Sequence, residues 1–554
     1  MSGNYTVADL VADFLQRCGV STAFGIVSVH NIPMLDSIKN RNAIRFVMTR
    51  GEMGGAHMAD AYARATGSLS ALFTSTGPGA ASAVPGLVEA RFAGSPVLHI
   101  TGQTATKFVD RGMGTVHDVA DQLGMLRSVG KAAYRIRSAQ EALGVLTKAA
   151  VQALSAPRGP VSIEIPIDIQ RAPLERPAAL DNFALPLPEP LAPASADLKR
   201  LADAVLAARR PMLWLGNGAK DAGAAALKLL DAGFRTVCSW NGRGIVSEDD
   251  ERNLGTLSGL GQPKVQAFYE TVDLMIVAGS RLRGHETYDF TVKLPANLIQ
   301  IDIDAQANGR TYPVKDFVRG DSAATLSALA DLVAGKMKVD PAFANDFAKV
   351  RAKARAEYKV SLGPYATFPE QVRAAMPKDA LWVRDITIAN SSWGNRLMPV
   401  YSPNENIYPV GAGIGLGLSL GIGAAVAGGK ERKTVVLSGD GGFALNIGEL
   451  WTAVQEKLDI VVIVMNDKGY GVIRQIQDAQ AGGRHSYDNL LVPDLEGVAR
   501  LAGIGFWRLT RAKDLKDTLS KAIDRAGPSI IEVDVGSIGP IPPYYPYDQK
   551  PKAA

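Results

Sequence analysis

Short apolar runs alternate with amphipathic stretches of helical period along the chain, and the alternation recurs in three blocks. In the first block, residues 71–75 and 97–102 are apolar runs of strand length, and residues 7–19 carry a helical pattern that ends at Gly19. Strands that alternate with helices form parallel sheets, because each helix carries the chain back across the sheet. The pattern therefore predicts an α/β fold with three α/β domains, each built on a parallel sheet.

The second and third blocks repeat the pattern. Further strands are predicted at residues 211–218, 274–280, 297–304, 433–441 and 459–467, with helices at 196–208 and 448–457. In parallel sheets of this kind, ligands bind beyond the carboxyl ends of the strands. We therefore expect the functional residues at these strand ends.

Proline-rich stretches of low periodicity separate the blocks. Residues 172–197 have the composition of an extended linker, and a weaker boundary falls near residues 362–369. We therefore expect domains at about 1–171, 190–335 and 365–540.

Residues 410–429 form an uncharged, mostly apolar segment of the length that spans a bilayer. Eight of these residues are glycine, and polar and charged runs flank the segment. A glycine-rich turn that enters a buried helix of small residues fits this composition better than a membrane span.

Composition and charge narrow the class of protein. The chain is 47% hydrophobic and 21% charged, with a formal net charge of +5, and its Lys and Arg residues are scattered. These values indicate a globular protein and favour neither nucleic acid nor an anionic membrane as a partner. Cys18 and Cys238 lie far apart in sequence, so no disulfide framework is implied. The amino-terminal segment lacks the features of a signal peptide, and we expect a cytoplasmic protein.

Two of the predicted strands end in polar and glycine residues that suit a metal and a phosphate. The first ends in Gly-Asp-Gly-Gly at residues 439–442, and the second ends at Asn466. If these strands are neighbours, Asp440, Asn466 and the carbonyl of Lys468 offer oxygen ligands of the kind that Mg²⁺ prefers. Gly441 and Gly442 would let backbone amides approach a phosphate at a helix start. Taken alone, Gly-Asp-Gly is also common turn chemistry.

The spacing of this motif resembles the signature of thiamine diphosphate (ThDP)-dependent enzymes, in particular the group of acetolactate synthase, benzoylformate decarboxylase and benzaldehyde lyase. The resemblance extends over almost the whole chain. It implies a pyrimidine-binding domain, a central nucleotide-binding-like domain and a diphosphate-binding domain, with ThDP and Mg²⁺ as cofactors.

The resemblance assigns the activating carboxylate of the family to Glu52. Relatives carry a motif similar to R-H-E before a helix, and this chain has Arg50-Gly51-Glu52 before A-H-M-A-D-A-Y-A-R. Such a carboxylate contacts N1′ of the cofactor's pyrimidine and drives it to the imino form. Gly51 stands where relatives have His or Glu, so one neighbouring polar contact is absent. The structural alternative is a first-turn Glu that the helix dipole favours.

The family motif that bends the cofactor falls on residues 413–423, and Ile414 takes the position of the apolar wedge between the two rings. The carbonyl of Ala412 and the amide of Ile414 would bind the aminopyrimidine. Simple core packing is the alternative for Ile414. The resemblance also assigns further residues to the cofactor site: Thr387, Gly413, Gly469 and Tyr470.

Three histidines are candidates for proton transfer: His30, His117 and His285. Each stands in a segment that lines the active site of relatives, and a satisfied structural histidine is the alternative for each. Arg281 leaves FAD open as a second cofactor. The following residues read L-R-G-H-E instead of the flavin-contacting F-D-D-R of the synthases, which argues against it.

The resemblance implies a ThDP- and Mg²⁺-dependent 2-oxoacid decarboxylase and carboligase, similar to acetolactate synthase, that cleaves and forms C–C bonds through an enamine. Its small-molecule partners would be a 2-oxoacid and an aldehyde or second 2-oxoacid acceptor. An FAD-free enzyme similar to benzoylformate decarboxylase or an aldehyde lyase is the alternative, and a non-catalytic regulatory subunit of the same fold is a third reading. The family builds its site from two chains, so we expect at least a homodimer, and commonly a homotetramer.

Overall fold

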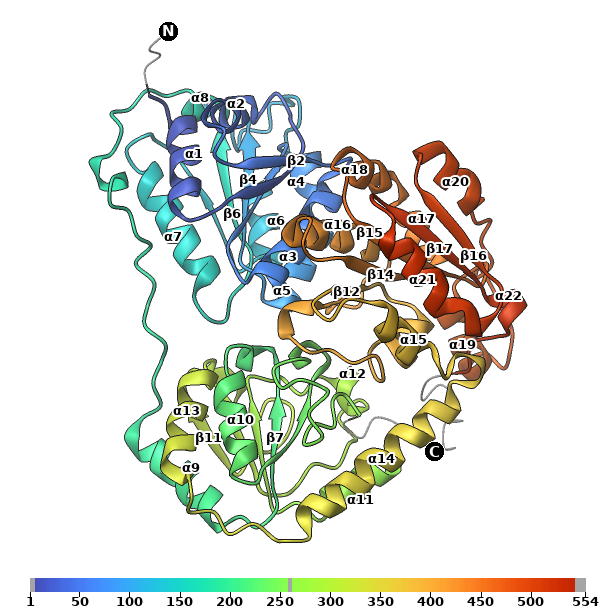
Figure 1. Cartoon of the computed structure of the whole chain (residues 1–554). Coiled ribbons are helices and arrows are strands. Elements are labelled where there is room, and N and C mark those ends of the chain that lie inside the picture. Colours follow the sequence, from blue (N-terminus) through green and yellow to red (C-terminus); the bar gives the residue numbers. More distant parts are fainter. Residues whose placement is uncertain (1–4, 258–261, 544–554) are drawn as a thin grey trace.

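The computed structural model describes residues 5–257 and 262–543, which form three lobes around three sheets (Figure 1). The strand orders are β2-β1-β3-β4-β6-β5, β11-β10-β9-β7-β8 and β13-β12-β14-β15-β17-β16. Neighbouring strands in all three sheets run parallel. The predicted fold class, three α/β domains with parallel sheets, is confirmed.

The first lobe contains the elements from α1 to α8. They are α1 (Val7–Arg17), β1 (Thr22–Gly25), α2 (Ile32–Arg41), β2 (Arg45–Met48), α3 (Glu52–Thr66), β3 (Ser70–Thr74), α4 (Pro78–Ser82), α5 (Val84–Ala93), β4 (Val97–Gln103), α6 (Gln122–Val129), β5 (Ala132–Arg135), α7 (Ala142–Leu154), β6 (Val161–Pro166) and α8 (Ile167–Gln170). A capping box fixes the start of α1, since the Thr6 side chain accepts from the amide of Asp9 and the Asp9 side chain accepts from the amide of Thr6. The two strands predicted in this block, β3 and β4, are confirmed.

An extended connection, interrupted only by η1 (Ala178–Leu180), runs from the first lobe to the second (Figure 1). The second lobe contains α9 (Ser195–Ala207), β7 (Pro211–Leu215), η2 (Asn217–Ala219), α10 (Gly223–Asp231), β8 (Arg235–Cys238), η3 (Trp240–Gly242), α11 (Pro263–Tyr269), β9 (Leu274–Ala278), α12 (Gly284–Thr287), β10 (Leu298–Asp302), η4 (Ala305–Ala307), β11 (Asp316–Arg319) and α13 (Ser322–Val333). The long helix α14 (Phe343–Ser361) then leads to the third lobe.

The third lobe contains η5 (Gly363–Tyr365), α15 (Phe368–Ala375), β12 (Leu381–Arg384), the π-helix η6 (Asn390–Gly394), η7 (Pro403–Glu405), β13 (Asn406–Ile407), α16 (Gly417–Gly428), β14 (Thr434–Gly439), α17 (Asp440–Leu445), η8 (Ile447–Glu449), α18 (Leu450–Gln455), β15 (Ile460–Asn466), α19 (Gly471–Gln480), α20 (Leu495–Ala502), β16 (Gly505–Leu509), η9 (Ala512–Asp514), α21 (Leu515–Asp524), β17 (Ser529–Asp534) and α22 (Val535–Ile538).

The helix predicted at 448–457 is confirmed as η8 followed by α18, but the short helix α17 before them was not predicted. Helical structure begins already at Asp440, breaks at Asn446 and resumes as η8 and α18. At the break, the Asn446 side chain donates a 2.6 Å hydrogen bond to the carbonyl of Gly415, a residue distant in sequence.

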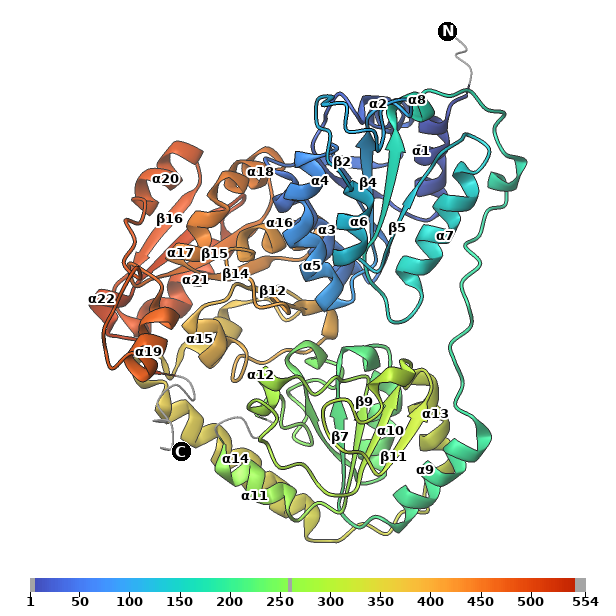
Figure 2. The same cartoon turned by 180° about the vertical axis from the view of Figure 1, so that it is seen from behind.

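The glycine-rich segment 410–429 forms a turn followed by the buried helix α16, as predicted. Gly423 of α16 packs directly against the backbone of Met58 in α3, where a β-carbon would collide with the Met58 carbonyl. The two helices lie side by side between the first and third lobes in both views (Figure 1 and Figure 2). Over the part of the chain that the structure describes, none of the helices is long and apolar enough to cross a membrane.

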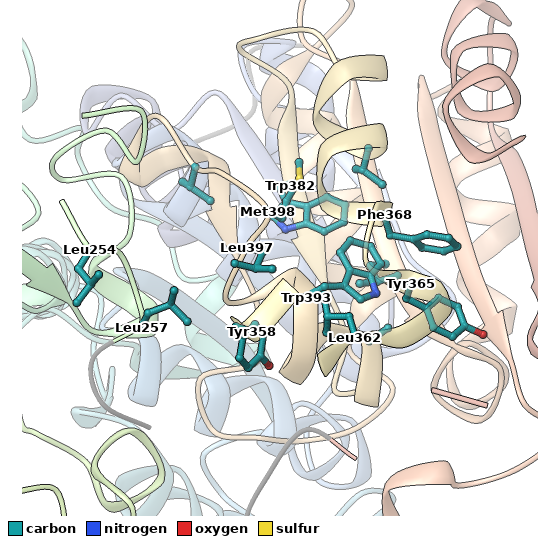
Figure 3. Packing of buried hydrophobic residues seen from close by; sticks show 14 of the residues in the cluster. Leu254, Leu257, Tyr358, Leu362, Tyr365, Phe368, Trp382, Trp393, Leu397 and Met398 are labelled. Carbon is teal, nitrogen blue, oxygen red and sulfur yellow. The ribbon is translucent and has the colours of Figure 1, made fainter. Parts of the chain in front are cut away.

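An aromatic cluster packs Trp382 of β12 against residues on either side of that strand in the sequence. The rings of Trp382 and Trp393 lie 6.0 Å apart, and Phe368 packs edge-on against Trp393 at 5.8 Å (Figure 3). Both tryptophans are essentially inaccessible to solvent. Burial of such large side chains holds the chain rigidly on either side of residue 385, next to the candidate site.

Candidate active site

The carboxyl ends of β14 and β15 meet at one edge of the third sheet. The two strands pair in parallel up to Gly439 and Met465, as the sequence analysis required of them. Asp440 is the first residue of α17 and Asn466 is the last of β15, so both side chains stand at the same edge.

The oxygen atoms at this edge are held in place by the protein. The Asp440 carboxylate accepts hydrogen bonds from the amides of Gly441 (2.9 Å) and Gly469 (3.0 Å). The Asn466 amide nitrogen donates to Glu532 at 2.7 Å, which fixes the direction of its amide oxygen. Lys468 has a positive φ of 57°, a backbone conformation that L-residues seldom adopt.

The donor set at this edge fits Mg²⁺. It combines one carboxylate with an amide oxygen and a backbone carbonyl, all hard oxygen ligands. Burial, followed by the neighbouring charge of Asp440, raises the pKa of Asp467 to about 7, so a cation here would offset the repulsion between two carboxylates. Across residues 5–257 and 262–543, no cluster of three or more His, Cys, Asp or Glu side chains is placed to bind a metal.

Glycine residues allow close packing of side chains at this edge. A β-carbon on Gly441 would lie 2.8 Å from the ring of Tyr470. Thr387 packs over Gly439, at 3.6 Å from where a β-carbon would stand, and its hydroxyl accepts from the amide of Ala389 at 3.0 Å. The start of α17 therefore lies beside a threonine and a tyrosine, and backbone amides at a helix start can bind an anion.

The loop before α16, residues 412–416, presents Ile414. Ala412 has a positive φ of 63°, and the Ile414 side chain is 43% exposed, so it is not part of the core of its own chain. The loop is held from below by Asp385, a buried residue that the sequence analysis missed. Its carboxylate accepts from the amides of Gly415 (2.9 Å) and Gly417 (3.0 Å). Burial raises the pKa of Asp385, and the hydrogen bonds from these amides oppose that rise.

Glu52 is the first residue of α3 and lies at the carboxyl edge of the first sheet. Its carboxylate rests against Gly79, where a β-carbon would be 2.5 Å from Glu52 Oε1, and it makes no hydrogen bond or ion pair with any residue that the structure describes. A half-buried carboxylate without a protein partner is an acceptor available to a ligand.

A second carboxylate, Glu449, fixes the turn that carries Glu52. It is only 4% exposed and accepts from the amides of Arg50 (3.1 Å) and Gly51 (3.0 Å) and from the hydroxyl of Thr452 (2.6 Å). The sequence analysis missed Glu449 as well, because it lies about 400 positions from the turn that it holds.

The contact that links α3 to the segment before the Ile414 loop lies near the far end of the helix from Glu52. Glu52 stands at one end of α3, while Arg64, near the other end, donates to the carbonyl of Tyr408 in the segment that leads to the Ile414 loop. Twelve helical residues separate Glu52 from Arg64, which is ~18 Å at the rise of an α-helix. Among the described residues, no hydrogen bond or ion pair joins Glu52 to the 412–416 loop or to Asp440.

Comparison with known proteins identifies the family. Models of the thiamine pyrophosphate enzymes match the chain in three parts: the N-terminal TPP binding domain at residues 5–125, the central domain at 198–329 and the C-terminal TPP binding domain at 388–533. The chain belongs to the thiamine pyrophosphate (ThDP) enzyme family.

Individual relatives agree with this assignment. The chain is 30% identical to a protein named "Probable 2-ketoarginine decarboxylase" from Pseudomonas aeruginosa, over 95% of this chain and 94% of the relative. It is 27% identical to the large subunit of acetolactate synthase isozyme 1 from Escherichia coli, over 98% and 96% of the two chains. An X-ray structure from Mycobacterium smegmatis, assigned as a thiamin diphosphate-dependent enzyme, has the same fold, with a TM-score of 0.77, 24% identity and coverage of 96% and 99%. The chain is thus a ThDP-dependent enzyme of the acetolactate synthase and decarboxylase family.

In this ThDP-family chain, two of the three candidate histidines lie together. The Nδ1 atoms of His30 and His117 are 3.3 Å apart and the ring centroids 5.0 Å apart. Burial, followed by the charge of His117, lowers the pKa of His30. His285 lies on the second lobe instead, edge-on to Trp240 at 4.7 Å, and burial lowers its pKa too. Within one chain, His30 and His117 therefore lie together, and His285 lies apart from them.

A cavity of about 500 Å³ lies between the first and second lobes of the ThDP-family fold, over the carboxyl ends of the second sheet. Asn217, Gly279 and Asp302 line it from the ends of three strands, and Arg281 contributes a guanidinium whose pKa burial lowers. Arg281, the residue that left FAD open as a second cofactor, lines this cavity. The cavity is separate from the Asp440 edge.

A buried ion network joins the pyrimidine-binding part of the ThDP fold to the segment before Ala412. Arg64 pairs with Asp60 (2.5 Å) and with Glu89 (2.7 Å), and it donates to the carbonyl of Tyr408 at 2.6 Å. Glu89 in turn accepts from the amides of residues 410–411 at 2.6 and 2.9 Å. These contacts fix where the Ile414 loop begins.

Replacing Arg64 with Met should destabilise the fold strongly. The substitution leaves the carboxylates of Asp60 and Glu89 buried without their cation, which costs ~3 kcal/mol or more of the free energy of unfolding. Urea denaturation measures the change. The exposed Arg511→Met is the matched control, and equal stability of the two variants would contradict a structural role for the network.

Proposed function

We propose that the chain is a ThDP- and Mg²⁺-dependent 2-oxoacid decarboxylase and carboligase, similar to acetolactate synthase, with domains at about 1–171, 190–335 and 365–540. The observation that carries the proposal is the sheet edge where Asp440, Asn466 and the Lys468 carbonyl offer hard oxygen ligands beside the start of α17. Intact Glu52 supports a catalytic protein over a non-catalytic regulatory subunit.

When bound, ThDP would supply a C2 carbanion that attacks a 2-oxo carbonyl and a cationic thiazolium ring that accepts the electron pair released as carbon dioxide leaves. Asp440, Asn466 and the Lys468 carbonyl would hold Mg²⁺, and the amides at Gly441 and Gly442 would bind the diphosphate.

The remaining roles concern the cofactor's ring system. Ile414 would keep the two rings bent toward each other, and the Ala412 carbonyl would orient the aminopyrimidine. Gly413, Gly469, Tyr470 and Thr387 would complete the walls of the site. Glu52 would hold a proton at N1′ of the pyrimidine, which makes the amino group on the opposite side of the ring a better base for the C2 proton.

We propose that the site is completed by a second copy, so that Glu52 of one chain faces the diphosphate edge of its partner. Two observations support this: the Glu52 carboxylate has no hydrogen-bond or ion-pair partner among the described residues of its own chain, and Ile414 is exposed on the single chain. A homodimer is the minimum assembly, and a homotetramer would pair two such dimers.

The histidines are the proposed acid–base groups at the substrate. His30 and His117 would exchange protons with the reacting carbonyl from the first lobe, and His285 from the second. Because one relative is named as a 2-ketoarginine decarboxylase, we include 2-ketoarginine beside pyruvate among the 2-oxoacid donors to be tested.

The second candidate function is an FAD-free enzyme similar to benzoylformate decarboxylase or an aldehyde lyase. The position of His285 against Trp240, at the border of the second and third lobes, favours it. We propose that the chain needs no FAD, because the stretch after Arg281 lacks the flavin-contacting pattern of the synthases.

A carbon dioxide assay on pyruvate, benzoylformate and 2-ketoarginine, combined with product analysis, separates these functions. Acyloin products from pyruvate support the synthase-like function, and aldehyde release from benzoylformate supports the alternative. A colourless preparation is expected, and a stoichiometric flavin spectrum would contradict FAD independence. A protein that binds ThDP and decarboxylates none of the three would favour the regulatory subunit.

Removal of divalent metal should weaken ThDP binding by about tenfold or more, because the diphosphate and the Asp440 carboxylate would then face each other without a cation between them. Calorimetric titration of ThDP with EDTA, and again after Mg²⁺ is restored, measures this. Identical affinities under the two conditions would contradict the assigned metal site.

A further inference from the structure

Asp385 is a buried carboxylate whose hydrogen-bond partners are all uncharged donors. It follows β12 directly, is 0% exposed, and accepts four hydrogen bonds. The donors are the amides of Ile386 (2.7 Å), Gly415 (2.9 Å) and Gly417 (3.0 Å) and the hydroxyl of Ser438 (3.3 Å). A carboxylate has about four acceptor positions, so these donors fill it.

This occupancy excludes two simpler roles for Asp385. A filled carboxylate has no acceptor position left for a metal ion. It also cannot attract a diphosphate, because its own negative charge repels one. Burial of a charge without a counter-ion is unfavourable, so the four hydrogen bonds are the interactions that stabilise the Asp385 carboxylate.

Two of these four hydrogen bonds join Asp385 to the Ile414 loop. Gly415 and Gly417 lie on the carboxyl side of Ile414, and Gly415 has a positive φ of 89°. A β-carbon on Gly417 would lie 2.7 Å from the Asp385 β-carbon, so the loop approaches the carboxylate as closely as a backbone can. The Gly415 carbonyl is held as well, by the Asn446 side chain at 2.6 Å. The peptide units after Ile414 are therefore fixed from two sides.

We propose that Asp385 is the positioning residue of the Ile414 loop: by fixing the amides of Gly415 and Gly417, it sets how far the Ile414 side chain projects between the two rings of bound ThDP. The inference rests on the proposed function, since it takes the wedge role of Ile414 from there. Asp385 touches neither ring and acts only through the loop.

The test replaces Asp385 with Asn, which keeps the size of the side chain. Its NH₂ group would then face the amide of Gly415 or Gly417, and two donors repel each other. Hydrogen exchange in the metal- and cofactor-free protein is the first readout. We expect the backbone amides of the 413–417 loop to exchange about tenfold faster or more, while those of the β14 and β15 strands keep their protection.

The matched control is Ser438→Ala, which removes the longest of the four hydrogen bonds and leaves both loop amides bound. Its exchange pattern in the loop should equal that of the wild type. If Asp385→Asn and Ser438→Ala give the same loop exchange as the wild type, Asp385 does not hold the loop and the inference is overturned.

A double-mutant cycle tests whether Asp385 acts through Ile414. The readout is the exchange of the C2 proton of ThDP with D₂O, followed by NMR with Mg²⁺ present. We expect Asp385→Asn and Ile414→Ala each to slow it by about tenfold, and the double variant to be scarcely slower than either one, because both changes remove the same wedge. Additive losses would indicate a general effect on stability and overturn the inference.

The same preparations separate this inference from the proposed function. A wild-type protein that binds no ThDP in calorimetry overturns the proposed function and the inference that rests on it. If the wild-type protein binds ThDP and exchanges the C2 proton, and the Asp385→Asn variant exchanges it at the same rate, the inference alone is overturned. Should Asp385→Asn fail to fold, Asn446→Ala releases the adjacent peptide unit at the Gly415 carbonyl. Slowed C2 exchange then supports a held loop, and unchanged exchange overturns the inference.

Discussion

Replacing Glu52 with Gln should lower the rate of C2 proton exchange and of turnover by at least about a hundredfold, the contribution typical of a general acid–base group. The amide is the same size but cannot take the charge that stabilises the imino form of the pyrimidine. ThDP affinity should change little, because the diphosphate and metal contacts lie on other residues. Single-turnover kinetics together with calorimetry measure both quantities.

The control for Glu52 is Glu496→Gln, which changes an exposed carboxylate on the third lobe. It should behave as the wild type in both measurements. If Glu52→Gln retains C2 exchange within a few-fold of the control, the residue is a first-turn glutamate that serves only the helix dipole, and the assignment is wrong.

Replacing Asp440 with Ala should abolish ThDP binding in the presence of Mg²⁺, raising Kd by about a hundredfold or more. The change removes the one carboxylate of the metal site and with it the charge that attracts the cation. Calorimetric titration of Mg²⁺–ThDP measures the loss. Asp478→Ala, at an exposed position on α19, is the control and should leave Kd unchanged.

Unchanged binding in the Asp440→Ala variant would contradict the metal site. If Asp440→Ala binds Mg²⁺–ThDP as tightly as the Asp478 control, the Gly-Asp-Gly sequence is only a turn after a strand. The metal would then have to lie elsewhere, and the roles given to Asn466 and Lys468 would fall with that of Asp440.

The edge that carries Asp440 and Asn466 could be predicted because its signals are local. Each strand is an apolar run that ends in a polar residue, and neighbouring parallel strands bring such ends together. The break in the helix after β14 was not predicted; the Asn446 side chain at the break contacts Gly415, about 30 positions away. Patterns of hydrophobicity do not report where a single side-chain amide finds its partner.

The residues that position the site were missed for the same reason. Asp385 binds Gly415 and Gly417 across about 30 positions, and Glu449 binds the turn before Glu52 across about 400. A single buried acidic residue produces no periodic pattern in the sequence. One signal was present, however: Asp385 directly follows an apolar strand, the same position that singled out Asp440 after β14.

The central claim is that each active site takes Glu52 from one chain and the Asp440 edge from another. Mixing two inactive variants, Glu52→Gln and Asp440→Ala, tests it most directly. In a mixed dimer one site receives both intact residues and the other receives neither, so random reassociation should restore about a quarter of wild-type turnover. If each site were built within a single chain, both chains would remain defective and the mixture would stay inactive. Recovered turnover after unfolding and refolding the two variants together is the predicted result, and no recovery from dimers shown to be mixed would contradict the account.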